Sequence, residues 1–152
     1  MTERIQISAH SPEGYRKVNG LDSYVTSNLD TELVNFIYLR ASLINGCTYC
    51  VDAHSVDLAE GGTDPRRIYS VRTWKESTFY SQRERAAFAL TEAITLIAGT
   101  DGVDDATWDA AVAVFSDKEL SDIVLAIATI NVWNRIAIPT RMQTPPLAVL
   151  VP

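Results

Sequence analysis

The chain has 152 residues, of which 47% are apolar and 21% are charged, a size and composition typical of one ordinary globular domain. Its 13 basic and 19 acidic residues give a formal net charge of −6, so the basic footprint required for nucleic-acid binding is missing. The longest apolar stretch, residues 123–130, is far shorter than the roughly 20 residues of a membrane span. Residues 1–5 contain no apolar run of the kind found in secretory signals. We therefore expect a cytoplasmic protein that binds neither nucleic acid nor membrane.

The spacing of apolar residues and the helix-capping residues predict an all-α fold of about six helices. Residues 1–29 are expected to be irregular, apart from a short helix near 12–18. Asp30 is a candidate cap for the first long helix, and Pro139 is expected to stop the last one. Two capping boxes, residues 81–84 and 116–119, mark further helix starts. The helices are predicted at residues 31–45, 47 or 48 to 60, 64–73, 82–98, 104–115 and 117–138, within a single domain spanning 1–152.

The only two cysteines, Cys47 and Cys50, form a C-x-x-C motif that is followed by His54. Positions separated by three, four or seven residues share one face of a helix. If the helix begins at or before Cys47, the three side chains point the same way. So few cysteines, so close together, do not suit a disulfide-stapled secreted domain, and a pair of this kind in a reducing compartment suggests redox chemistry or metal binding.

Thiol chemistry requires the thiolate, and an ordinary cysteine with a pKa of about 8.5 is mostly protonated at neutral pH. A helix N-terminus favours an anion, and His54 can accept the thiol proton. An activated thiolate attacks peroxide to form a sulfenic acid, which a second thiol can condense to a disulfide. An external thiol must then reduce that disulfide. The helix dipole favours Cys47 as the attacking residue, whereas proximity to His54 favours Cys50, so the residues alone leave the roles open.

Two other interpretations of the pair compete with redox chemistry. The cysteines can be inert packing residues. Alternatively, Cys47, Cys50 and His54 can supply three zinc ligands, although no second cysteine pair completes a closed tetrahedral site. A lone histidine on a helix is more often structural than catalytic, and it is the spacing of His54 from Cys50 that makes it a candidate.

The run from Leu39 to His54 resembles the core motif of the AhpD-like alkyl hydroperoxidases of the carboxymuconolactone decarboxylase superfamily. The similarity covers roughly residues 30–138, which we take as the core of the domain. Downstream positions that resemble the family are Trp74, Phe79, and the segments 84–87, 90–93 and 130–135.

This resemblance implies an AhpD-like helical fold, with the C-x-x-C at the N-terminus of a central helix, that assembles into a homo-oligomer. It implies a thiol peroxidase that uses no haem, flavin or metal. In the family's pattern, Cys50 attacks the hydroperoxide, Cys47 resolves the intermediate, and His54 serves in the proton relay. The partners implied are a hydroperoxide substrate and a thiol or dihydrolipoyl-type reductant protein.

One position departs from the family pattern. Well-characterised members have a relay glutamate twelve residues before the first cysteine, where this chain has Asn35. An amide cannot accept a proton at neutral pH, but it can orient His54 by hydrogen bonding. Two other functions therefore remain as alternatives: a non-enzymatic thiol redox sensor or interaction module, and a cysteine-independent lyase of the same superfamily.

Three charged residues outside the motif are candidate supporting residues. Glu84 belongs to a capping box, and Glu92 follows two turns later on the same predicted helix. Arg135 lies in a largely apolar helix and needs a carboxylate partner if it is buried, and we expect Glu84 or Glu92 to supply it. Either carboxylate is also a candidate to replace the missing relay glutamate. The apolar segment 145–152 is expected to dock on a neighbouring subunit.

Overall fold

The computed structural model describes residues 2–146, and within this range the chain forms helices and no strands. The all-α prediction is therefore confirmed, with eight α-helices and two short 3-10 helices in the described part. The elements are α1 (Ile7–His10), α2 (Pro12–Asn28), α3 (Thr31–Asn45), α4 (Thr48–Glu60), α5 (Pro65–Ser70), η1 (Val71–Thr73), α6 (Gln82–Thr95), η2 (Ile97–Gly99), α7 (Asp105–Val112) and α8 (Asp117–Thr140).

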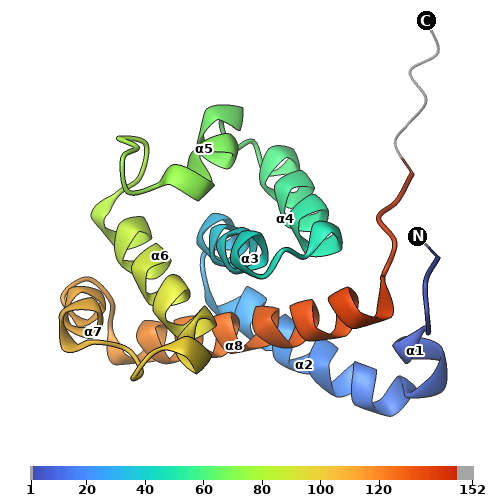
Figure 1. The fold of residues 1–152 in the computed structure, drawn as a ribbon. Coiled ribbons are helices and arrows are strands. Elements are labelled where there is room, and N and C mark those ends of the chain that lie inside the picture. The colour runs from blue at the N-terminus through green and yellow to red at the C-terminus, as the bar shows by residue number, and fades with distance from the viewer. Residues whose placement is uncertain (1, 147–152) are drawn as a thin grey trace, which may run out of the picture.

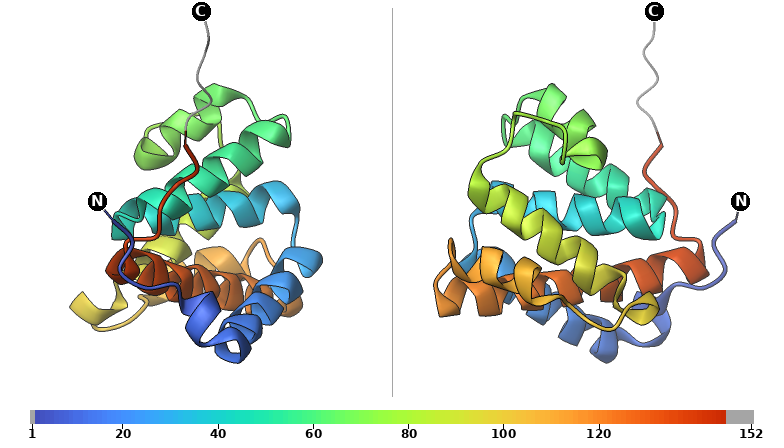
Figure 2. Two further views of the ribbon diagram at one scale, coloured as in Figure 1. Left: turned by 90° about the vertical axis from the view of Figure 1, so that its right-hand side faces the viewer. Right: turned by 60° about the vertical axis from the view of Figure 1, so that its left-hand side comes forward.

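Helix α3 is the centre of the fold. It packs against α4, α6 and α8, and Figure 1 shows it nearly end-on with these helices around it. A helix enclosed in this way must be apolar on most of its circumference, and its buried residues occupy several faces: Leu33, Val34, Phe36, Ile37, Tyr38, Leu39, Ala41 and Ser42. The long helix α8 runs below α3, and α2 lies along the outer side of α8 (Figure 2). The N-terminal end of α4 and the C-terminal end of α8 lie close together beside this core.

The predicted caps explain where the main helices begin. The Asp30 side chain accepts the backbone N–H of Leu33 at 2.9 Å at the start of α3. Both predicted capping boxes are present, Ser81 with Glu84 and Ser116 with Glu119. In each box the two side chains satisfy backbone N–H groups that have no partner within the helix. Local sequence therefore determines the starts of α3, α6 and α8.

The N-terminal region differs from the prediction. Instead of an irregular segment with a short helix, it contains α1 and the 17-residue helix α2. Tertiary packing overrides the weak local signal of its Gly, Asn and Ser residues. Val25 is fully buried, and the Tyr15 ring meets Trp133 of α8 edge-on, with centroids 5.1 Å apart.

Three predicted helix ends are also wrong. Helix α6 ends at Thr95 rather than at 98, and α7 spans only Asp105–Val112. Pro139 does not stop α8, which continues to Thr140 and ends where Arg141 adopts a left-handed conformation with φ 58°. A proline removes only one backbone hydrogen bond, to the carbonyl four residues earlier, and that carbonyl belongs to the exposed Arg135. The predicted docking segment lies mostly outside the described residues, which end at 146.

Among the described helices, α8 alone is long and apolar enough to cross a membrane, with a mean hydropathy of 1.4 over its most apolar window. In this fold its apolar side chains pack against α2, α3 and α6. Length and composition do not distinguish a core helix of this kind from a membrane span.

Candidate functional site

The two cysteines lie at the turn between α3 and α4. Gly46 has φ 73°, a left-handed conformation that glycine adopts without steric cost, and it directs the chain from one helix into the next. Cys47 is the residue that caps α4, and its sulfur accepts the backbone N–H of Cys50 at 3.3 Å. The two side chains form a disulfide, and they are only 1% and 4% exposed. The predicted proximity of the pair is thus present, and α4 begins at Thr48, one of the two predicted starts, with Cys47 as its cap.

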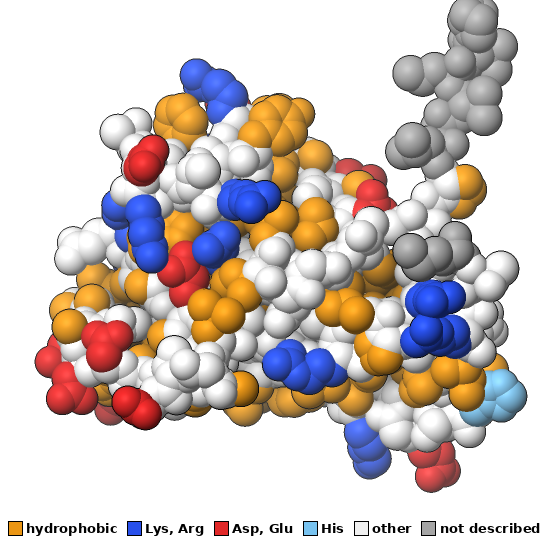
Figure 3. Space-filling model, in the orientation of Figure 1, with side chains coloured by type: hydrophobic (Ala, Val, Ile, Leu, Met, Phe, Trp, Pro, Cys, Tyr) orange, Lys and Arg blue, Asp and Glu red, His pale blue; other side chains and the backbone are white. Residues whose placement is uncertain are grey.

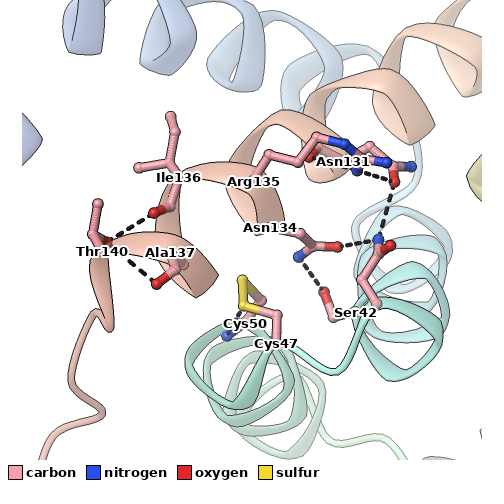
Figure 4. The surroundings of a disulfide bond; sticks show 10 residues. Ser42, Cys47, Cys50, Asn131, Asn134, Arg135, Ile136, Ala137 and Thr140 are labelled. Atoms are coloured by element: carbon pink, nitrogen blue, oxygen red, sulfur yellow. Dashed lines mark hydrogen bonds between the residues drawn. A yellow bond between two sulfur atoms is a disulfide. The ribbon is translucent and has the colours of Figure 1, made fainter. Parts of the chain in front are cut away.

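A hydrogen-bond network of buried and half-buried side chains attaches this turn to α8 (Figure 4). Asn45 donates to Asn131 Oδ1 at 3.0 Å and to Asn134 Oδ1 at 2.7 Å. Asn134 in turn donates to Ser42 Oγ at 3.0 Å. Both Asn134 and Ser42 are fully buried, where an unsatisfied polar group would cost free energy. The network therefore fixes the disulfide turn against α8. It also explains why the otherwise apolar sequence of α8 contains Asn131 and Asn134.

The His54 ring is oriented by Asn35 of α3. Asn35 Nδ2 donates to the Thr31 carbonyl at 3.1 Å, which leaves Asn35 Oδ1 as the acceptor 3.2 Å from His54 Nδ1. The Asp57 carboxylate lies 3.4 Å from the same nitrogen. Because both neighbours are acceptors, Nδ1 carries the proton and Nε2 is left as the basic nitrogen. Burial lowers the pKa of His54 from 6.5, against the opposing effect of Asp57 and Asp22.

Cys50 and His54 both line a cavity of about 220 Å3. Asp22 of α2 also lines it, and its carboxylate accepts the Tyr38 hydroxyl at 2.7 Å. The Tyr38 ring in turn lies edge-on to the His54 ring, with centroids 4.9 Å apart. Aromatic and apolar side chains supply most of the remaining wall, which is the usual character of a small-molecule site. The lining residues are Tyr15, Asn19, Asp22, Tyr49, Cys50, Ala53, His54, Trp133, Ala137 and Met142.

The two glutamates considered as relay residues lie elsewhere. Glu92 accepts hydrogen bonds from Arg40 at 2.7 Å and from the Trp74 indole at 2.6 Å, and Lys75 lies 2.9 Å from its second oxygen. Glu84 pairs with Arg67. Both carboxylates are held by cations of neighbouring segments, so they cannot replace the missing relay glutamate.

The expected carboxylate partner of Arg135 is also absent among residues 2–146. Arg135 is exposed, and its guanidinium donates to the carbonyl and the side-chain oxygen of Asn131 at 3.1 and 2.8 Å. A solvated arginine needs no buried counter-ion. The condition for the predicted ion pair, burial of Arg135, is not met, because this residue lies on an exposed face of α8.

Sequence reasoning missed Asp22, Tyr38 and Trp133. Asp22 and its helix were hidden because the N-terminal region was predicted to be irregular, and Tyr38 was hidden within an apolar helix. Asp57, three residues after His54, was detectable from the helical spacing that identified the histidine itself. Within residues 2–146, no group of three or more His, Cys, Asp or Glu side chains forms an arrangement suited to a metal ion.

Comparison of the sequence with known proteins identifies the family to which the chain belongs. The sequence profile of the carboxymuconolactone decarboxylase family matches residues 12–93. The chain belongs to this family. It is 34% identical over 139 residues to the uncharacterised protein YdfG of Bacillus subtilis, covering 91% of this chain and 94% of the relative.

Two solved structures bear on the fold. A protein of unknown function from Agrobacterium tumefaciens, described as a candidate antioxidant defence protein AhpD, superimposes with a TM-score of 0.92 at 39% identity. The superposition covers 95% of this chain and 99% of that one. The debrominase Bmp8 superimposes with a TM-score of 0.80 at 23% identity, covering 90% of this chain and 74% of its own. The AhpD-like fold is thereby confirmed, and it is a fold that hosts more than one chemistry.

Proposed function

We propose that this family member is a thiol-dependent peroxidase that reduces hydroperoxides through Cys50 and Cys47. The observation that carries the proposal is the cavity that Cys50 shares with His54, beside a disulfide to Cys47. A sulfur, a base with a free nitrogen and a partner thiol at bonding distance are the groups that peroxide reduction requires.

The reaction begins with the reduced pair. His54 Nε2 accepts the Cys50 thiol proton, and the thiolate attacks the terminal oxygen of the hydroperoxide. A sulfur–oxygen bond forms as the oxygen–oxygen bond breaks, and the departing alkoxide takes a proton to leave as an alcohol. Cys47 then attacks the Cys50 sulfenic acid, a disulfide forms, and water leaves. The substrate gains two electrons and the dithiol loses two, so a thiol or dihydrolipoyl-type reductant must restore the pair.

The assignment of Cys50 as the attacking residue weighs two opposing effects. The Cys50 backbone N–H and the start of α4 stabilise negative charge on the Cys47 sulfur. Such a helix-end effect contributes about 0.3–1 kcal/mol at exposed sites and up to about 2 kcal/mol at partly buried ones. Access to a proton acceptor and to the substrate cavity favours Cys50, because Cys50 lines that cavity and Cys47 does not. We give the second effect more weight.

The test is a steady-state peroxidase assay on the wild type, Cys47→Ser and Cys50→Ser, with dithiothreitol or a dihydrolipoyl donor. We expect Cys50→Ser to abolish peroxide reactivity. Cys47→Ser should react once and stop as a sulfenic acid that a selective probe labels on Cys50. Labelling of Cys47 in Cys50→Ser, with none in Cys47→Ser, would reverse the roles.

The same assay separates the redox sensor from the enzyme. A protein whose disulfide forms and is reduced, but which turns over no hydroperoxide, is a redox sensor rather than an enzyme. The lyase alternative needs a separate assay, because it predicts lyase activity that survives serine at both positions. We propose a homo-oligomer as the working form.

A further inference from the structure

A second cavity, of about 370 Å3, reaches the disulfide at Cys47. Cys50 does not line this cavity, just as Cys47 does not line the cavity of His54. Three residues line both spaces and form the partition between them: Tyr49, Ala137 and Met142. Each sulfur of the one disulfide is therefore approached from its own cavity.

The two cavities carry opposite charge. Among the described residues that line the Cys47 cavity, Arg141 is the one charged side chain. Arg4 is fixed to the same end of α8, where its side chain and backbone donate to the carbonyls of Pro139 and Thr140 at 3.1 and 2.8 Å. The Cys50 cavity instead contains the Asp22 carboxylate. Figure 3 shows basic side chains where the N-terminal segment meets the end of α8.

The two reactants that the proposed peroxidase must bind differ in charge in the same way. Most hydroperoxides are neutral, whereas a disulfide is reduced by a thiolate anion. A thiolate is repelled by Asp22 and attracted by Arg141, and a neutral hydroperoxide is affected little by either. Charge thus directs the reductant toward the cavity at Cys47, while the neutral hydroperoxide can still enter the cavity at Cys50.

We propose that the cavity at Cys47, which contains Arg141, is the entry site for the reducing thiolate and favours thiols that carry a further negative charge. This inference rests on the proposed function, in which the hydroperoxide uses the cavity at Cys50. The thiolate attacks Cys47 Sγ, forming a mixed disulfide as the Cys47–Cys50 bond breaks. Cys50 leaves as a thiolate and takes up a proton, and a second thiolate then displaces Cys47 and leaves as the oxidised disulfide of the reductant. Two electrons pass from two thiols to the protein, and the sulfur released first is the one beside His54.

The first experiment identifies the sulfur that is attacked. Oxidised protein is treated briefly with 3-mercaptopropionate and then quenched with an excess of N-ethylmaleimide, which alkylates the released protein thiolate and consumes the remaining reductant. Fragmentation of the peptide that contains both cysteines is expected to give the mercaptopropionate adduct on Cys47 and the maleimide on Cys50. The reverse pattern would overturn the inference.

The second experiment tests the cavity. Ile138 lines it and is 44% exposed, while Val56, on the outer surface of α4, is 46% exposed and lines neither cavity. We expect Ile138→Trp to lower the rate constant for reduction at least tenfold more than that for oxidation. Val56→Trp, the matched control, should change the two rate constants equally. Equal effects of Ile138→Trp on both half-reactions would contradict a separate entry site.

The third experiment tests the charge. Reduction rates, normalised to thiolate concentration, are compared for 3-mercaptopropionate, 2-mercaptoethanol and cysteamine. The wild type should prefer the anionic thiol over the cationic one, and Arg141→Gln should reduce this ratio roughly two- to fivefold at low salt, with less effect as salt screens the charge. A ratio unchanged by Arg141→Gln would overturn the proposal that Arg141 gives this cavity its preference for anionic thiols. A disulfide that no thiol reduces would instead refute the proposed function.

Discussion

Replacing Asn35 by glutamate tests how the proton relay works in a chain without the family's glutamate. In the native protein the acceptor at His54 Nδ1 is a neutral amide oxygen 3.2 Å away. A glutamate at this position would put a negative charge near the same nitrogen. It would thereby stabilise the protonated imidazole and make His54 a stronger base for the Cys50 thiol.

The size of the effect follows from the distances. Two unit charges about 4 Å apart interact by about 4 kcal/mol at an effective dielectric constant of about 20. Asp57 already lies 3.4 Å from Nδ1, but its side chain is 52% exposed and its effect is therefore screened. The burial of the new carboxylate offsets a further part. We expect about 1–3 kcal/mol of added stabilisation of the imidazolium, a raised pKa of His54, and roughly three- to tenfold faster thiol oxidation near neutral pH.

The assay is stopped-flow oxidation of the reduced protein by hydrogen peroxide, together with NMR titration of His54. Asn35→Gln is the matched control, because it adds the same methylene group without the charge. Equal rates and equal His54 titration in Asn35→Glu and Asn35→Gln would refute the reasoning. A raised pKa of His54 without faster oxidation would show that proton transfer from Cys50 does not limit the rate of oxidation.

Four further predictions follow from the described contacts. Because burial lowers the pKa of His54 from 6.5, the unfolded chain binds this proton more readily. The free energy of unfolding should therefore fall as the pH drops through 6.5 toward the lower folded-state value, and His54→Gln should flatten this slope in urea titrations between about pH 7.5 and 5.5. Asn134→Ala leaves the buried Ser42 hydroxyl without its donor and removes one of the two acceptors of Asn45, so it should cost about 1–3 kcal/mol, seen as a lower urea midpoint. Glu92→Gln should lower the melting temperature but leave the oxidation rate of the thiols within about twofold, since its carboxylate serves packing of α6 rather than the site. Leu125 and Val132 are 38% and 40% exposed and lie two turns apart on α8, so glutamate at both should shift a homo-oligomer toward monomer in sedimentation velocity, whereas an unchanged profile would exclude this face as the contact.

Sequence reasoning worked where the determining interactions are local. The start of α3 is set by Asp30, and the starts of α6 and α8 are set by boxes of four consecutive residues. The spacing of Cys47, Cys50 and His54 is likewise a property of one helix and its cap. Each of these features depends on atoms within a few residues of one another, so one chain segment contains all the information.

It failed where the partner lies far away in the chain. Helix α2 has no buried residue other than Val25 and is stabilised by its packing on α8, more than a hundred residues later. The partners of Glu84 and Glu92 were equally hidden, because nothing in helical spacing shows that Arg67 or Arg40 approaches from another segment. Long-range contacts of this kind are tertiary and have no periodic signature.

The candidate site itself combines both kinds of information, and this has a consequence for how its chemistry can vary. The sulfur and the base come from α4, but the acceptor that selects the tautomer of His54 comes from α3 and the charge in its cavity comes from α2. Asn35 and Asp22 can therefore change without disturbing the C-x-x-C-x-x-x-H motif. A shared motif identifies the reactive groups, whereas the basicity of the histidine and the charge of the admitted reactant are set by residues outside it. Substitutions at Asn35 and Asp22 are therefore expected to change the reaction that this fold supports while the motif stays the same.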